Sequence, residues 1–166
     1  IQGLIDLYEA SQDARWLTWA LALQEQENKL FYDAGNGGFF TTAQDHDSNL
    51  LVRSREDYDN VEPSASSISV FNLLRLAQYA DRDEWRKMAQ TTLEMFAGNM
   101  KEHPRSFPQM IAALNFYLGK PQQIIIAGAP DSPDTLEMMR LARRRFFFNS
   151  VISCLAWACF SGLPRR

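Results

Sequence analysis

Apolar residues recur along most of this chain at the spacing of an α-helix. Leu4, Leu7 and Tyr8 lie three and four residues apart, which places them on one face of a helix. The polar run 11–13 interrupts the pattern and offers a cap for a second helical stripe over 14–32. The pattern therefore predicts two helices separated by a short polar break.

Three further helical stripes follow in the second half of the chain. Residues 64–67, directly after Pro63, offer hydroxyl groups that can cap a helix over 68–79. Apolar positions at helical spacing recur over 85–96 and again over 110–117. These stripes predict a mainly α fold.

Four short runs have the composition of β-strands instead. Residues 39–42 and 50–53 are separated by a polar turn, which predicts a small β-hairpin. Residues 122–128 contain three consecutive isoleucines and end in Ala-Gly, as buried strands do. An amphipathic stretch over 136–145 and a second candidate strand over 149–155 follow. This β-α-β order predicts a parallel pair at the C-terminal end.

The sequence pattern of the first predicted helix pair recurs in the second pair. Residues 4–10 match residues 73–79 in their apolar positions, and the same offset of 69 residues brings Trp16 onto Trp85. Self-similarity at a fixed period is the signature of repeated supersecondary units. We therefore expect an α/α-hairpin repeat in which each pair buries a face on its neighbour, although two copies leave a chance resemblance open.

Composition narrows the function classes. The chain has 166 residues, 46% of them apolar, which is enough for a buried core. Its net charge of −3 argues against nucleic acid as a partner. No apolar run reaches the roughly 20 residues that span a bilayer, and no secretory signal is visible, so we expect a cytoplasmic protein without a membrane partner. Cys154 and Cys159 fit neither a zinc nor a redox spacing and indicate free buried thiols.

A family resemblance rests on several short stretches that occur in one order: Gly37–Phe40, Leu51–Arg53, Asp57–Ser64, Asn72–Ala77, Gln123–Gly128, Asp134–Thr135 and Asn149–Ile152. Together they resemble the spermatogenesis-associated protein 20 family, whose bacterial members are described as thioredoxin-domain proteins. The resemblance covers the chain up to about Ile152. Because the chain starts at Ile1 and its tail after Ile152 departs from the family, we expect a truncated C-terminal part.

The resemblance implies a fold. Family members carry a thioredoxin-like domain followed by an (α/α)6 toroid of the kind found in six-hairpin glycosidases and sugar epimerases. This chain resembles the last part of that toroid and the segment after it. We expect a partial toroid over 1–120 with the small β-hairpin, and a β-α-β segment with a divergent tail over 121–166. The thioredoxin-like cysteine motif has no counterpart here, so no thiol chemistry is carried over.

One loop carries the candidate chemistry. Loops between hairpins line the cleft of an α/α toroid, and sugar chemistry uses a carboxylic acid together with a base or nucleophile. The candidate ligand-binding residues are Arg53, Asp57, Asp59, Glu62 and Ser64. The alternative is structural, because acidic and hydroxyl side chains before a helix commonly serve as caps. No residue is assigned a catalytic role. One departure lies close by, since Ser66 stands where the family's loop usually has Asn.

Other polar motifs have plainer interpretations. His46 lies between two aspartates, but adjacent residues rarely bind one ion together, so we expect no metal site. The glycines at 35, 37 and 38 are not followed by the Lys-Ser/Thr of a phosphate loop, and we expect no cofactor. The arginines at 140 and 143–145 suit the negative end of a helix dipole.

Two functions remain open at this point. The first is a fragment of a carbohydrate-active toroid that binds a sugar-like small molecule at residues 57–64. The second is a non-catalytic binding or assembly module that forms a homo-oligomer, because a partial toroid leaves apolar hairpin faces uncovered. The residues do not decide whether the chain is an enzyme.

Overall fold

The computed structural model describes residues 1–44, 53–56, 58–129, 131–144 and 149–155. In chain order the elements are α1 (Gln2–Ser11), α2 (Ala14–Phe31), α3 (Ala65–Ala80), α4 (Asp83–Glu102), the 3-10 turn η1 (Pro104–Ser106), α5 (Pro108–Leu118), β1 (Gln122–Ala127), α6 (Pro133–Arg144) and β2 (Ser150–Leu155). The predicted mainly α class is confirmed. Within the described part, no helix is long and apolar enough to cross a membrane.

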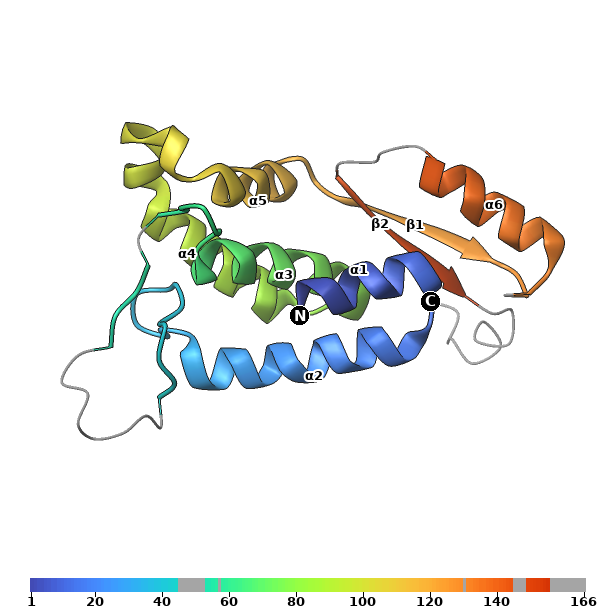
Figure 1. The fold of residues 1–166 in the computed structure, drawn as a ribbon, viewed down its shortest axis with the longest axis horizontal. Helices are drawn as coiled ribbons and strands as arrows, with labels where there is room; N and C mark the ends of the chain where they lie inside the picture. Colours follow the sequence, from blue (N-terminus) through green and yellow to red (C-terminus); the bar gives the residue numbers. More distant parts are fainter. Residues whose placement is uncertain (45–52, 57, 130, 145–148, 156–166) are drawn as a thin grey trace.

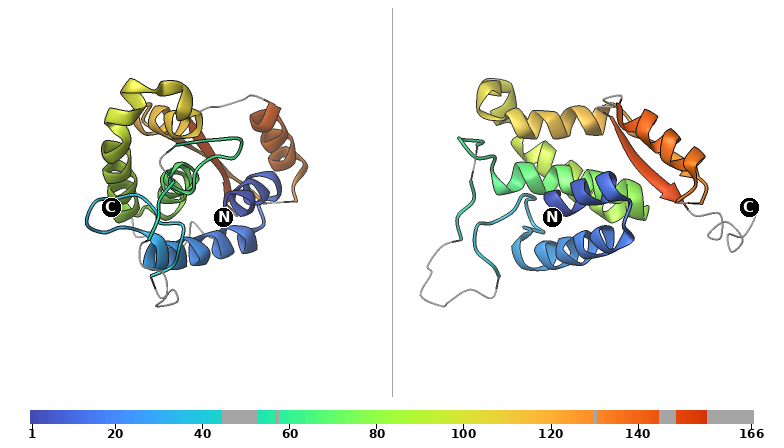
Figure 2. Two further views of the ribbon diagram at one scale, coloured as in Figure 1. Left: turned by 60° about the vertical axis from the view of Figure 1, so that its left-hand side comes forward. Right: turned by 45° about the vertical axis from the view of Figure 1, so that its right-hand side comes forward.

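Helix α3 lies at the centre of the helical part, with the other helices arranged around it (Figure 1 and Figure 2). It contacts α1, α2, α4 and α5. Ten of its 16 residues are buried, and five of these ten are polar or charged. Because groups taken out of water need partners inside the protein, the neighbours of α3 must supply hydrogen bonds as well as apolar surface.

The predicted repeat is visible in the backbone. The first hairpin breaks at Gln12 (φ 59°) and the second at Asp81 (φ 50°), both in the left-handed region and 69 residues apart. Helices α2 and α4 then begin at Ala14 and Asp83, which differ by the same offset. The two hairpins therefore share one turn geometry. The (α/α)6 toroid implied by the family stays a prediction.

The predicted helix caps are confirmed. The Asp13 carboxylate accepts from the backbone N–H of Arg15 at 3.0 Å and starts α2. The Ser64 hydroxyl accepts from the backbone N–H of Ser67 at 3.2 Å and starts α3. A side chain of this kind satisfies one of the backbone donors that the first turn of a helix leaves unpaired.

Charged contacts hold α1 and α2 against α3. Arg75 of α3, whose side chain is 8% exposed, forms ion pairs with Asp6 at 2.8 Å and with Glu9 at 2.9 Å on α1. From the other side, the Ser69 hydroxyl donates to Glu27 of α2 at 2.8 Å. Directional polar contacts thus add to apolar packing in setting the position of both helices.

The C-terminal segment forms the predicted parallel pair. Strands β1 and β2 run in register from Gln122 opposite Ser150 to Ala127 opposite Leu155. Helix α6 contacts β1, while α1 and α3 contact β2. The sheet and α6 therefore lie at one end of the molecule, beyond the helices (Figure 1).

The predicted hairpin of residues 39–42 with 50–53 lies partly outside the described residues. In the part that is described, Phe39 forms an isolated antiparallel bridge with Tyr32. The backbone N–H of Thr41 donates to the Ser54 carbonyl at 2.9 Å. The backbone of residues 39–42 thus contacts the C-terminal end of α2 on one side and the returning loop on the other.

A half-buried carboxyl group, that of Glu27, lies between α2 and α3. The fully buried Gln24 donates to Glu27 at 2.6 Å and to Asn28 at 2.9 Å. Burial raises the pKa of Glu27 above its ordinary value of 4.5, and the hydrogen bonds from Ser69 and Gln24 offset only part of this effect.

This carboxyl group makes stability depend on pH. Because the folded pKa of Glu27 lies above 4.5, the folded protein holds a proton that the unfolded chain releases between pH 4.5 and the folded pKa. The free energy of unfolding should therefore fall as pH rises through this window. We expect Glu27→Gln to remove that decline, measured by urea unfolding at several pH values. Glu25→Gln, an exposed change on the same helix, should keep it, and an equal decline in both variants would contradict the assignment.

Candidate functional site

The loop between α2 and α3 carries all the predicted site residues. It crosses the ends of the helices on the side of the molecule opposite the sheet (Figure 1). Gly37 and Gly38 have φ of 83° and 81°, where other residues are strained. A Cβ on Gly37 would lie 3.0 Å from Thr91, and one on Gly38 would lie 3.0 Å from Met95. The glycines therefore let the loop approach α4 closely, which agrees with a turn rather than a phosphate loop.

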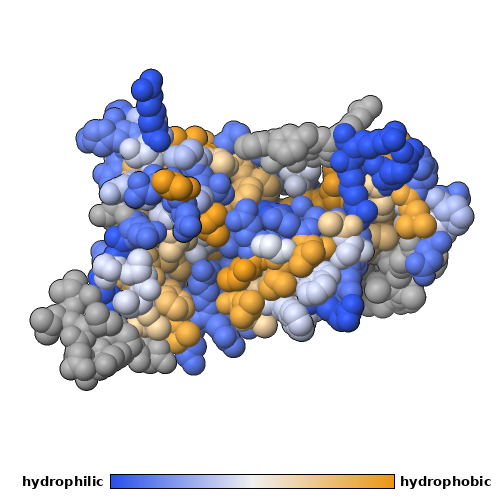
Figure 3. Space-filling view, in the orientation of Figure 1, coloured by the Kyte–Doolittle hydropathy of each residue, from blue (hydrophilic) through white to orange (hydrophobic). Residues whose placement is uncertain are grey.

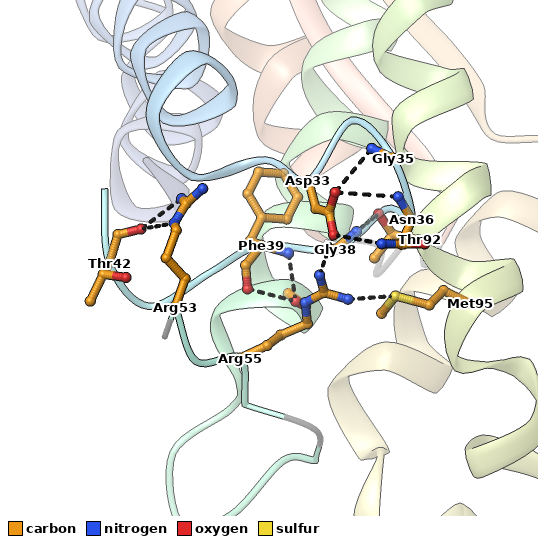
Figure 4. A network of polar contacts seen from close by, with 11 residues as sticks. Asp33, Gly35, Asn36, Gly38, Phe39, Thr42, Arg53, Arg55, Thr92 and Met95 are labelled. Atoms are coloured by element: carbon orange, nitrogen blue, oxygen red, sulfur yellow. Dashed lines mark hydrogen bonds and ion pairs between the residues drawn. The ribbon is translucent and has the colours of Figure 1, made fainter. Parts of the chain in front are cut away.

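Arg55 and Asp33 form the polar centre of this loop (Figure 4). Their side chains, 17% and 15% exposed, form an ion pair at 2.7 Å. Asp33 also accepts from the backbone N–H groups of Gly35 and Asn36. Burial alone would raise the pKa of Asp33, but the hydrogen bonds from Gly35, Asn36 and Arg55 outweigh it and lower the pKa below 3.8. The ion pair therefore links the start of the loop, at Asp33, to Arg55 22 residues later in the chain.

Arg53, a predicted site residue, is committed to the backbone. Its guanidinium donates to the Thr42 carbonyl at 2.7 Å (Figure 4). It also donates to the Leu30 carbonyl at 3.0 Å, near the C-terminus of α2. The guanidinium carbon also lies 4.0 Å from the ring centre of Phe40, and that of Arg55 lies 4.8 Å from it. Arg53 thus stabilises the end of α2 and stacks on an aromatic ring.

Asp59 joins the starts of two helices. One carboxylate oxygen accepts from the backbone N–H of Ser64 at 2.9 Å, at the N-cap of α3. The other accepts from Gln109 at 2.9 Å and Met110 at 3.3 Å, in the first turn of α5. A carboxylate near two helix N-termini is favoured by both dipoles. In the described contacts Asp59 therefore has the structural role that the sequence left open.

Ser64 and Ser66 are also occupied by local contacts. The buried Ser64 hydroxyl caps α3 and lies 2.8 Å from the Ser67 hydroxyl. Ser66, which stands where the family usually has Asn, accepts from the Phe39 N–H at 3.0 Å and donates to the Phe39 carbonyl at 3.4 Å. Ser66 therefore ties the loop to α3.

Glu62 lies in a different environment from Asp59 and Ser64. Its side chain is exposed and lines a pocket of about 430 Å³ at the outer side of the loop. The pocket lining consists of charged and polar side chains, one aromatic ring and one proline: Arg55, Glu56, Tyr58, Asn60, Glu62 and Pro63. Tyr58 is 54% exposed and also borders a second pocket of about 320 Å³ with Glu102 and His103. Asp57 lies outside the described residues.

The structure therefore divides the predicted site. Arg53, Asp59 and Ser64 hold the loop and the helix ends, while Glu62 lines the exposed pocket. The sequence motifs did not indicate Arg55 and Glu56, although both lie within two residues of Asp57 in the sequence. Among the described residues, no group of three His, Cys, Asp or Glu side chains is arranged to hold a metal ion. His46 falls outside the described part.

The fold and this loop define the class of the protein, a helical-hairpin domain with a polar pocket on the loop between α2 and α3. No family model matches the chain. Over 152 residues, 92% of its length, the chain is 36% identical to spermatogenesis-associated protein 20 of Mus musculus. The corresponding rat protein is 37% identical over the same share of the chain. An uncharacterised protein of Caenorhabditis elegans is 31% identical over 149 residues, 90% of the chain.

The chain is a spermatogenesis-associated protein 20-like sequence, and the resemblance seen in the short motifs is confirmed. It spans 19% of the length of the mouse and rat relatives and 20% of the nematode protein. The homology therefore assigns ancestry to this region. It does not bring the activity of a whole relative to this chain.

The structural role of Asp59 can be tested by a change of one atom. Asp59→Asn turns one acceptor oxygen into a donor that faces backbone N–H groups. We expect a loss of about 1–3 kcal/mol in the free energy of unfolding, the usual cost of leaving buried donors unpaired. Chemical denaturation measures the loss. Glu62→Gln makes the same change at an exposed position of the loop and should leave stability unchanged; an equal loss in both would argue against the helix-joining role.

Proposed function

We propose that this chain binds a sugar-like, polyhydroxylated small molecule at the pocket beside residues 55–63. The main observation that supports this proposal is the exposed ring of Tyr58 among carboxylate, amide and guanidinium side chains. Sugars present both apolar C–H faces and hydroxyl groups. An exposed aromatic ring with polar neighbours suits both, since the ring supplies apolar area and the polar groups supply orientation.

The polar groups of the pocket suit a hydroxyl-rich ligand, and their charge disfavours an anionic one. Glu56 and Glu62 can accept hydrogen bonds from hydroxyl groups, and the Asn60 amide can donate as well as accept. The Arg55 guanidinium is already paired with Asp33, so it brings little free positive charge. Asp57, between Glu56 and Tyr58 in the sequence, stays part of the proposed site. Two carboxylates are also the groups that glycoside chemistry uses, but the proposal concerns binding alone.

A panel of monosaccharides and disaccharides tests the proposal by isothermal titration calorimetry. We expect at least one sugar to bind and Tyr58→Ala to weaken it about tenfold, which corresponds to about 1.4 kcal/mol. Leu118→Ala is the control, because Leu118 is 65% exposed at the end of α5, lies outside the proposed association face and lines neither loop pocket. No binding across the panel, or equal affinity in Tyr58→Ala and the parent, would overturn the proposal.

We also propose that copies of this chain associate through the outer face of α1 and α2. Figure 3 shows apolar side chains gathered along these two helices. Leu7, Trp19 and Leu23 are each about half exposed there. In hairpin repeats each unit buries a face on its neighbours, and a second copy could cover this one.

Light scattering after size-exclusion chromatography tests the association. We expect a dimer or higher oligomer at micromolar concentration, and we expect Leu7→Glu with Leu23→Glu to yield a monomer by placing charges in the buried interface. Leu118→Glu, an exposed leucine at the end of α5, is the control and should leave the oligomer intact. A monomeric parent protein would refute this proposal.

A further inference from the structure

A further pocket, separate from the two at the loop, lies at the opposite end of the molecule. It has a volume of about 450 Å³ and separates α6 from the junction of α1 and β2. One wall is a single face of α6, because Leu136, Met139, Arg140, Arg143 and Arg144 follow at helical spacing. The first turns of this face are apolar and the last turns are basic.

The opposite wall is held in place by Gln12. Its side-chain amide donates to the Ile152 carbonyl at 3.4 Å, and its side-chain oxygen accepts from the Cys154 N–H at 2.6 Å. Gln12 therefore pairs with the backbone of β2 as a neighbouring strand would. This contact positions Cys154 on the pocket wall, facing the same cavity as the arginines of α6.

The charge of the pocket is positive. Arg140 is paired with Glu137 at 2.6 Å, and Asp131 is the acidic residue in the lining. Arg143 and Arg144 form no ion pair with any residue in the described part of the chain. Their guanidinium groups therefore leave the cavity with unneutralised donors, which suit the oxygens of a phosphate or carboxylate.

The position within the fold supports a binding role. Two lining residues lie near the carboxyl ends of the strands: Asp131 follows β1, and Cys154 is the second-last residue of β2. In open α/β sheets, ligands bind in the crevice outside the carboxyl ends of parallel strands. Ser132 closes the start of α6 by accepting from the Thr135 N–H at 3.3 Å, so the basic side chains at the far end of the helix supply the positive charge.

We propose that this pocket binds a small organic oxyanion, with Arg143 and Arg144 contacting its phosphate or carboxylate group and Leu136 and Met139 contacting its apolar part. The site is separate from the sugar pocket and does not depend on it. Cys154 serves as a reporter in the wall.

Alkylation of Cys154 tests the local potential. In a Cys159→Ser background Cys154 is the sole thiol, and its rates with anionic iodoacetate and neutral iodoacetamide can be compared. The thiolate fraction affects both rates equally, so their ratio reports the local charge. At low ionic strength we expect Arg143→Gln with Arg144→Gln to lower the iodoacetate-to-iodoacetamide ratio about threefold. Lys101→Gln with Arg105→Gln removes the same charge far from the pocket and should leave the ratio unchanged.

Binding itself is tested with inorganic phosphate, and with acetate in parallel, against sodium chloride of equal ionic strength. We expect phosphate to slow the alkylation of Cys154 in the parent but not in the double arginine variant. Protection by acetate as well indicates that the site accepts oxyanions generally, whereas protection by phosphate alone assigns a phosphate-bearing ligand. An unchanged reagent ratio, or a changed ratio without protection by either anion, would overturn the proposal. Equal melting temperatures verify that the variants are folded.

Discussion

Helix α3 is buried among four other helices although half of its buried residues are polar, and each of these groups must regain in the protein a hydrogen bond that it lost from water. Separate segments meet this requirement for Arg75, Ser69 and Ser66, whereas the side-chain oxygen of Asn72 has no partner among the described residues. Helix α1 supplies carboxylates to Arg75, α2 supplies Glu27 to Ser69, and the loop supplies the backbone of Phe39 to Ser66. Because these partners come from separate parts of the chain, the arrangement of the helices follows from the polar demands of one helix as well as from apolar burial.

The same requirement shapes the loop on the far side of the helices. Asp59 contacts the starts of α3 and α5, and Arg53 contacts the end of α2. These side chains fix the position of the loop whose other residues line the pocket. The residues that face the pocket, such as Tyr58 and Glu62, are exposed and carry little of the fold. A rigid scaffold with exposed polar groups at its edge is a common arrangement for ligand recognition, and it places the proposed sugar site where substitutions need not unfold the protein.

The β-α-β unit at the other end is joined to the helices through Gln12. This residue ends α1, its side-chain amide donates to the Tyr8 and Glu9 carbonyls of that helix, and the same side chain pairs with the backbone of β2. A two-stranded sheet by itself is marginal in water. Its contacts with α1, α3 and α6 add to its stability. The chain spans about a fifth of the length of the curated relatives it matches. The pockets at its two ends therefore correspond to one region of those relatives.

The amino-acid sequence alone determined most of the local structure. Helical spacing, the caps Asp13 and Ser64, and the β-α-β order predicted the elements, because hydrogen bonds within a helix link residues only four apart. The short motifs also identified the ancestry. Tertiary structure alone decided the role of Asp59, whose partners Gln109 and Met110 lie about 50 residues away. It also decided that the basic face of α6 borders a pocket. Contacts of this kind depend on how whole helices pack against one another. The pattern of apolar and polar positions does not specify which polar side chains from different helices then come into contact.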